Sequence, residues 1–339
     1  AITGPQKFNE VLDSIMENIP IKSNPFEAKP SSSYIKLTPR HYSYLKISEG
    51  CNHKCSFCII PSLRGPLKSR SMTSILSEAK SLVERGTKEL LVISQDTSAY
   101  GLDLKFEETV VNGKKLKTNI YNLVNELASL GVWVRLHYIY PYPHVKQLIP
   151  LMDQNGVLPY LDVPFQHAHP DVLKRMARPS NNVHDLEQIS EWRSINPDLS
   201  IRSTFIVGFP GETESEFNFL LDWLEEAKID RVGCFKYEDV SGARSNAMEG
   251  HLHDDIIQDR YDRFMSRAQQ LSELKLKEKI GKKFTCVIDS VEQDHLICRS
   301  IFDAPEIDGI VSITKKQTHH RVGEPVSYTH LTLPTIVGV

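Results

Sequence analysis

The sequence lacks any run of about 18 apolar residues, and this absence argues against a transmembrane helix. It also lacks a charge imbalance, because 40 lysines and arginines stand against 43 aspartates and glutamates. A net charge of −3 argues against non-specific binding to nucleic-acid backbones as the main activity. No secretory signal is recognisable at the start, so we expect a cytoplasmic location. The length of 339 residues allows two or three domains.

Cysteine is scarce, and its distribution is uneven. Of six cysteines, three lie within eight residues, Cys51, Cys55 and Cys58, with the spacing CxxxCxxC. Thiolates this close together can reach one metal centre from a single loop, which fits a reducing compartment better than a disulfide framework. Three thiolates on a four-iron, four-sulfur cluster leave one iron free to bind a substrate or cofactor. The spacing therefore predicts an iron–sulfur cluster.

Two other interpretations of the cysteine triplet remain open. A closed zinc site normally has four protein ligands, and His53 is the candidate for the fourth. His53 lies between the first two cysteines, where the loop leaves it little room to turn inward. The third interpretation is a set of free buried thiols.

The middle of the chain alternates between strand and helix patterns. Alternating residues 42–47 predict a first strand, and the cysteine loop leaves its carboxyl end, where α/β barrels place their chemistry. Further strands are expected at 89–94, 133–140, 160–165, 200–207 and 231–237, with a hairpin inserted at 103–118. Together with a long helix at 254–280, they predict an α/β domain over residues 41–281, a partial (β/α)6 barrel.

The two ends of the chain differ from this pattern. Residues 1–40, rich in proline and serine after a short amphipathic helix, are expected to be the remnant of a further N-terminal domain and its linker. Residues 282–339 contain short alternating strands at 284–288, 295–299 and 309–313, which predict a small all-β barrel. The tail from about residue 327 is atypical, and it leaves open whether the last strand of this barrel is present.

The cysteine motif carries a family resemblance. CxxxCxxC after a first strand, with Phe57 before the last cysteine, resembles the radical S-adenosylmethionine (radical SAM) superfamily. The surrounding stretches 46–53 and 58–65, with Ser69-Arg70, resemble the methylthiotransferases within it, most closely those that modify an aspartate of ribosomal protein S-twelve. This resemblance implies a six-unit partial barrel followed by an OB-like TRAM domain, in which residues 303–309 match.

The resemblance also implies an activity and its cofactors. The expected reaction adds a methylthio group to the β-carbon of the target aspartate, after reductive cleavage of S-adenosylmethionine at a cluster held by Cys51, Cys55 and Cys58. A second cluster is expected in the N-terminal domain, and this sequence has no second cysteine triplet. We therefore expect the printed chain to cleave S-adenosylmethionine without coupling to product. A flavodoxin-type electron donor is expected; neither it nor the sulfur donor is identified by the sequence.

Polar residues and glycines at the predicted strand ends are candidates for contacts with S-adenosylmethionine. They are Phe57, Gln95, Asp96, Gln166, Gly208, Pro210 and Gly211. Glycines let a backbone approach adenosine closely, and beside the cysteines we expect residues 208–213 to form part of a cofactor wall. The alternative is a strand-to-helix turn, with Thr213 and Glu216 as a capping box. Arg202, within the fifth strand, could contact the cofactor carboxylate or form a core salt bridge.

Two alternative functions remain. The chain could be a tRNA-adenosine methylthiotransferase, or a non-enzymatic RNA- or protein-binding module with a structural metal. The local sequences 60–65, 94–101 and 304–309 resemble the ribosomal-protein enzymes more closely. The near-neutral charge also favours a protein substrate, because a tRNA enzyme is expected to carry a basic face.

Overall fold

The computed structural model describes Ser14 and residues 38–153, 156–178, 182–315 and 319–330. The amphipathic helix and linker expected before residue 38 lie outside these residues, apart from Ser14. Within the described part of the chain, no helix is both long and apolar enough to cross a membrane.

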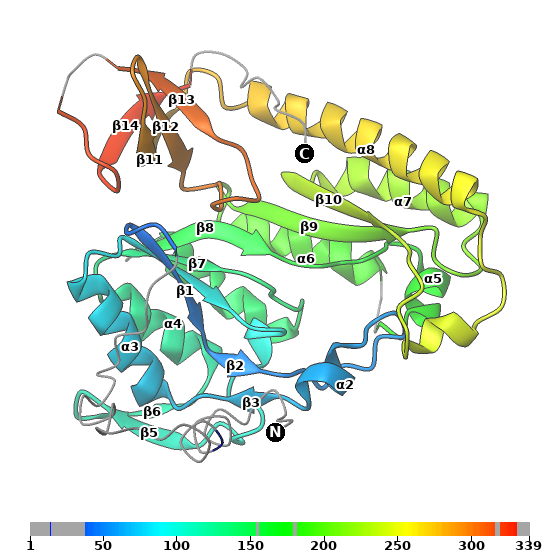
Figure 1. The fold of residues 1–339 in the computed structure, drawn as a ribbon, viewed down its shortest axis with the longest axis horizontal. Coiled ribbons are helices and arrows are strands. Elements are labelled where there is room, and N and C mark those ends of the chain that lie inside the picture. Colours follow the sequence, from blue (N-terminus) through cyan, green and yellow to red (C-terminus); the bar gives the residue numbers. More distant parts are fainter. Residues whose placement is uncertain (1–13, 15–37, 154–155, 179–181, 316–318, 331–339) are drawn as a thin grey trace.

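A six-stranded parallel sheet forms the first domain (Figure 1). Its strands lie in chain order: β1 (Tyr42–Lys46), β4 (Glu89–Ile93), β7 (Trp133–Leu136), β8 (Val157–Asp162), β9 (Ser200–Val207) and β10 (Arg231–Lys236). Helices α3 (Met72–Glu84), α4 (Ile120–Ala128), α6 (Asn182–Ile195) and α7 (Glu214–Ala227) connect successive strands, and α8 (Asp254–Lys277) packs against β10. This arrangement confirms the predicted partial barrel.

Alternation along each strand separates two environments. In β1, Leu45 points outward into the main apolar core with Ile75 of α3 and Leu123 of α4, all fully buried. Tyr42, Tyr44 and Lys46 share the opposite face, because successive side chains of a strand point to opposite sides. The helices therefore cover an apolar outer surface, and the polar residues of the strands face the interior of the barrel.

Prolines and a capping serine set the ends of several elements. Ser71 accepts the capping hydrogen bond of α3 from Ser74 N–H. Between β7 and β8 the chain forms two 3-10 turns, Pro143–Gln147 and Ile149–Asp153, because Pro150 has no N–H to donate. Strand β8 ends at Asp162, two residues before Pro164, which likewise cannot donate to a sheet ladder.

The shorter elements lie around the mouth of the barrel. Strands β2 (Ser48–Glu49) and β3 (Lys68–Ser69) pair on either side of the cysteine loop, which also contains α2 (Ile60–Arg64). The predicted hairpin is present as β5 (Glu108–Val111) and β6 (Lys114–Lys117), and both turn residues, Asn112 and Gly113, have positive φ. Helix α5 (Pro170–Arg175) follows β8, and a 3-10 turn, η4 (Arg244–Ala247), precedes α8.

The C-terminal domain is an antiparallel four-stranded sheet. Its order is β13 (Val311–Thr314), β12 (His295–Ser300), β11 (Lys283–Val291) and β14 (Pro325–Thr329). The register pairs Lys283 with Thr329, so the residues that begin the atypical tail form the last strand of the sheet. In the described residues this is a half-barrel, packed around buried Cys286, Ile288, Leu296 and Cys298.

Buried charges join the two domains at the amino ends of the barrel strands. The Glu89 carboxylate accepts from Arg135 Nε at 2.7 Å and lies 2.8 Å from Arg299 Nη1 of β12. Burial opposes ionisation of Glu89, but the two guanidinium groups outweigh it and hold the pKa of Glu89 below its usual value. Arg299 also bonds Asp289 of β11, so the network continues into the half-barrel.

The loop that follows β12 closes the same end of the barrel. Its side chains bond three strand residues: Asp303 pairs with Arg231 at 2.6 Å, Glu306 accepts from the Tyr42 hydroxyl at 2.7 Å, and Asp308 accepts from the Tyr160 hydroxyl at 2.7 Å. The half-barrel thus covers the barrel interior opposite the cysteine loop.

Removing Glu89 tests whether these charges hold the domains together. Glu89→Ala leaves the Arg135 and Arg299 guanidinium groups facing each other with their shared partner lost, and we expect the free energy of unfolding to fall by about 3–5 kcal/mol. Glu84→Ala, on the exposed face of α3, is the control. Urea denaturation followed by tryptophan fluorescence measures both, and equal stability of the two variants would contradict this assignment.

Candidate metal centre and cofactor cavity

The cysteine loop is held by backbone hydrogen bonds from distant segments. Cys51 N–H donates to Gly65 O at 3.1 Å, which closes the base of the loop. Ser56 donates from its N–H to Met176 O at 2.9 Å and from its hydroxyl to Arg175 O at 2.8 Å, both at the end of α5. On the other side, Ser245 N–H donates to Ser56 O. The loop is therefore fixed between its own base, α5 and η4.

The three thiols of the loop are partly buried, and two of them line one cavity. Cys51 and Cys58 line a cavity of about 420 Å³ together with Lys46, Ile60, Ile93, Ser94, Gln95 and Tyr138. Burial raises the pKa of both thiols, so neither is readily ionised alone. A bound metal supplies the positive charge that stabilises thiolates, and the donor set suits an iron–sulfur cluster.

A positive side chain lies beside the third thiol. Arg178 Nη1 lies 3.9 Å from Cys55 Sγ, and its guanidinium stacks over the Tyr140 ring at 4.5 Å. Arg178 also bonds Pro164 O, which fixes it at the end of β8. A cation in this position stabilises thiolate charge. Arg178 could not be identified from the sequence, because it lies 123 residues from Cys55 with no distinguishing motif around it.

His53 is directed to a different partner. Its Nε2 lies 2.9 Å from Asp96 Oδ2 and 3.0 Å from the Tyr142 hydroxyl, and its ring stacks on Tyr140 at 4.1 Å. Asp96, 3% exposed, uses its other oxygen to accept from Ser98 and Ala99. With His53 held in this way, the donor set is three cysteines, which fits a cluster with an open iron better than a four-ligand zinc site.

Among the predicted cofactor residues, Gln95 and Gln166 differ in their surroundings from Asp96 and Phe57. Gln95 lines the cavity, and its Nε2 lies 3.3 Å from Glu49 Oε1. Gln166, four residues after β8, has φ +73°, and its backbone bonds Thr204 and Ile206 of β9. Such strain in a non-glycine residue is typical of functional sites. Asp96 and Phe57 support the loop instead: Phe57 packs against an apolar cluster of Val172, Leu173, Met176, Phe209 and Tyr237.

Arg202 has protein partners on both sides. Its Nη1 lies 3.2 Å from Asp162 Oδ1, and its Nε lies 3.6 Å from Asp308 Oδ1 of the half-barrel. Burial disfavours the charged form, but Asp162 and its neighbours outweigh it and raise the pKa of Arg202. These contacts are those of a core salt bridge, one of the two alternatives that the sequence leaves open.

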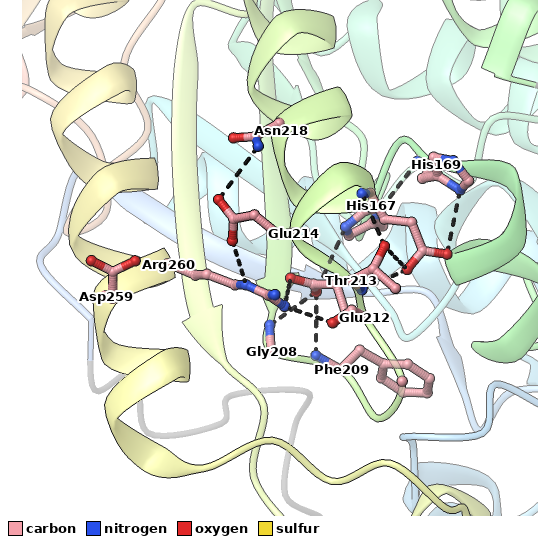
Figure 2. Close-up of polar contacts among 12 residues, drawn as sticks. His167, His169, Gly208, Phe209, Glu212, Thr213, Glu214, Asn218, Asp259 and Arg260 are labelled. Carbon is pink, nitrogen blue, oxygen red and sulfur yellow. Dashed lines mark hydrogen bonds and ion pairs between the residues drawn. The ribbon is translucent and has the colours of Figure 1, made fainter.

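The turn after β9 is built around a buried carboxylate (Figure 2). Glu212 Oε2 accepts from Gly208 N–H at 3.0 Å and Phe209 N–H at 3.3 Å, and its Oε1 accepts from Arg260 of α8 at 2.8 Å. Pro210 is buried in the same turn. Gly211, with φ +74°, donates to Gly250 O at 2.8 Å. Helix α8 and the segment before it are therefore held against the turn that follows β9.

Burial dominates the electrostatics of this turn. It raises the pKa of Glu212 to about 7, against the lowering effect of Arg260 and the two N–H donors. Burial also lowers the pKa of His167 to about 3, so this histidine is neutral at pH 7. His167 Nδ1 accepts from His169 N–H at 3.0 Å, and its Nε2 lies 3.7 Å from Glu212 Oε2. These groups connect the ends of β8 and β9.

Gly208 is required by packing as well as by its backbone conformation. Its φ is +78°, and a Cβ atom there would lie 2.7 Å from Ile257 Cγ1 on α8. The strand-to-helix turn therefore accounts for this glycine. The contact of Gly208 with the cofactor stays a prediction.

We expect each of Cys51→Ala, Cys55→Ala and Cys58→Ala to abolish cluster binding, because a cluster with two thiolates is poorly held. Cys234→Ala, in β10, is the matched control and should bind iron and sulfide as the unmodified chain does. Iron and sulfide analysis after anaerobic reconstitution measures this. Full occupancy by zinc in anaerobically purified protein would refute the iron–sulfur assignment.

Gly208→Ala should lower the free energy of unfolding for two reasons. An alanine in the left-handed backbone conformation costs about 1–2 kcal/mol, and overpacking of its Cβ against Ile257 costs about 1–3 kcal/mol more. Gly86→Ala is the matched control, because Gly86 has φ +103° with nothing within 4 Å of the added Cβ. The double variant Gly208→Ala, Ile257→Ala should recover the overpacking part. If Gly208→Ala melts like the control yet binds S-adenosylmethionine more weakly, the cofactor-wall interpretation is correct instead.

Comparisons with known proteins agree with this architecture. The family model "Radical SAM superfamily" matches residues 45–224, and the "TRAM domain" model matches residues 280–328. A structural comparison finds the Escherichia coli coproporphyrinogen III oxidase HemN, described as a radical SAM enzyme, with a TM-score of 0.50 at 13% identity over 76% of this chain and 64% of that one. At this identity the likeness concerns the fold alone.

Curated relatives are much closer in sequence. Ribosomal protein uS12 methylthiotransferase RimO of Paracoccus denitrificans is 55% identical over 97% of this chain and 71% of its own length. The RimO proteins of Roseobacter denitrificans and Stutzerimonas stutzeri are each 56% identical, and the chain spans 66% and 73% of their lengths. The chain therefore belongs to the RimO family of methylthiotransferases within the radical S-adenosylmethionine superfamily.

Proposed function

We propose that this protein adds a methylthio group to the β-carbon of an aspartate in ribosomal protein uS12, with an iron–sulfur cluster and S-adenosylmethionine as cofactors. The observation that carries the proposal is the cysteine triplet at the mouth of a partial barrel, in a chain 55% identical to RimO relatives. When bound, the cluster supplies the electron that cleaves S-adenosylmethionine and thereby allows hydrogen abstraction from carbon.

We assign the chain's own residues three tasks. Cys51, Cys55 and Cys58 hold the cluster, and Arg178 compensates the charge of the Cys55 thiolate. Gln95, which lines the cavity, and Gln166, which has a strained backbone four residues after β8, are the polar groups that we assign to orient S-adenosylmethionine. Asp96 acts indirectly, because it fixes His53 and with it the shape of the loop.

Exclusion of water is the fourth task of the barrel. Hydrogen abstraction from an unactivated carbon requires that solvent and unintended side chains stay away from the reacting groups. Ile60 and Ile93 give the cavity an apolar surface, and the ion pairs around Glu89 and Asp308 fill the opposite end of the barrel. A substrate would then approach from the side of the cysteine loop.

We propose a single cluster in the printed sequence. The three cysteines outside the triplet are separated: Cys234 is in β10, and Cys286 and Cys298 belong to the apolar core of the half-barrel. Burial raises the pKa of each of these thiols, which disfavours thiolate ligands. The natural compartment for this chemistry is the cytoplasm, where uS12 is available and thiols remain reduced.

Transfer of isotope from the substrate tests this function without requiring sulfur insertion. The reconstituted, reduced chain is given S-adenosylmethionine and uS12 carrying deuterium at the β-carbon of aspartate. We expect deuterium in the 5′-deoxyadenosine formed, because the abstracted atom comes from that carbon. Mass spectrometry of the nucleoside measures the transfer.

Two controls make the isotope result specific. Cys55→Ala should form no 5′-deoxyadenosine, whereas Cys234→Ala should behave as the unmodified chain. Deuterated tRNA adenosine, offered in place of uS12, should give no transfer. Transfer from the tRNA and not from uS12 would identify a tRNA methylthiotransferase and contradict the proposal; absence of any 5′-deoxyadenosine would favour a non-enzymatic module.

A further inference from the structure

We propose that Lys46, the last residue of β1, binds the side-chain carboxylate of the target aspartate and so positions its β-carbon at the cluster. This inference rests on the proposed function and adds a substrate contact to it. Lys46 is a positioning residue here, and the reaction itself takes place on atoms held by other groups.

The position of Lys46 follows from the alternation of β1. Tyr42, Tyr44 and Lys46 face the barrel interior, and along this series each residue lies nearer the cysteine loop than the one before it. The Tyr42 hydroxyl is occupied by Glu306 at the closed end of the barrel. Lys46 reaches the other end, where it lines the same cavity as Cys51, Cys58 and Gln95. Its side chain is 43% exposed, so a ligand can reach the ammonium group.

Lys46 is the cation that an incoming carboxylate would meet in the cavity. Lys46 pairs with Glu49, but the same carboxylate also lies 3.8 Å from Arg64 Nη1 and 3.3 Å from Gln95 Nε2. Glu49 is therefore shared among three donors and does not engage Lys46 alone. Lys46 is also the one lysine or arginine among the described residues that line the cavity.

A strained aromatic residue also lines the cavity. Tyr138 follows β7 with φ +56°, a conformation that costs a bulky residue free energy, and it is 50% exposed in the cavity. Thr97 N–H donates to Tyr138 O at 3.0 Å, which helps to hold the strained backbone. A side chain that enters between Lys46 and Tyr138 would meet a cation on one side and an aromatic ring on the other.

A carboxylate that enters this cavity loses part of its hydration, and this loss has to be compensated by a positive charge. The ammonium group of Lys46 provides it through a charge-assisted hydrogen bond, which an amide side chain of the same shape cannot form equally well. The other carboxylate expected here is that of S-adenosylmethionine. The experiment therefore measures the two ligands separately.

A double-mutant cycle pairs Lys46→Met with substitution of the target aspartate of uS12 by asparagine. Binding of fluorescent uS12 to the chain loaded with cluster and S-adenosylmethionine is measured anaerobically by anisotropy. The unmodified chain should prefer the aspartate form by about 10- to 100-fold, as expected for a hydrogen bond between charged groups. Lys46→Met should bind both forms equally, and Lys46→Arg should keep most of the preference.

Lys68→Met, on the exposed face of β3, is the matched control and should preserve the preference. Thermal melts and S-adenosylmethionine affinity should be unchanged in Lys46→Met. An undiminished aspartate preference in Lys46→Met would overturn the inference while leaving the proposed function intact. A loss of S-adenosylmethionine affinity alone would overturn it too and assign Lys46 to the cofactor. If uS12 in either form does not bind the unmodified chain, the proposed function fails, and the inference fails with it.

Discussion

The shape of the cysteine loop depends on hydrogen bonds from outside the loop. Between β2 and α2, residues 50–59 form no regular helix or strand, so the loop itself cannot fix the positions of three thiols. Gly65, Met176 and Ser245 bond its backbone, and Asp96 bonds His53. Met176 follows α5, Ser245 lies in η4 and Asp96 follows β4, so three of these partners come from separate parts of the barrel. The geometry of the metal centre is therefore a property of the assembled barrel.

The interior of the barrel is divided along its strands. At the amino ends, Glu89, Arg135 and Arg299 form a buried charge network that continues into the C-terminal sheet. At the carboxyl ends, the cavity beside Cys51 and Cys58 is open to ligands. Buried ion pairs contribute little to the net free energy of unfolding, but removal of one partner strongly destabilises a protein. Such pairs therefore fix the relative position of two domains more than they add to overall stability. The C-terminal sheet thus closes the barrel at the amino ends of its strands.

Much of this architecture could be predicted from local patterns, and the exceptions have physical causes. Alternation in β1 and the capping box at Thr213 and Glu216 depend on neighbouring residues, so they were recognised correctly. The contact of Arg178 with Cys55 depends on residues far apart in the chain, which one sequence cannot reveal. The contact of Gly208 with Ile257 of α8 likewise joins residues far apart in the chain, so local sequence could not show that packing also constrains this glycine.

The central claim is that three thiolates leave one iron of the cluster open to S-adenosylmethionine. Electron–nuclear double resonance on the reduced, reconstituted chain tests it directly, with S-adenosylmethionine carrying nitrogen-15 in its amino group and oxygen-17 in its carboxylate. Chelation of the open iron predicts hyperfine coupling to both labels. Coupling to neither label, in a chain that has bound both cluster and S-adenosylmethionine, would mean that the fourth iron has another ligand and would contradict the account.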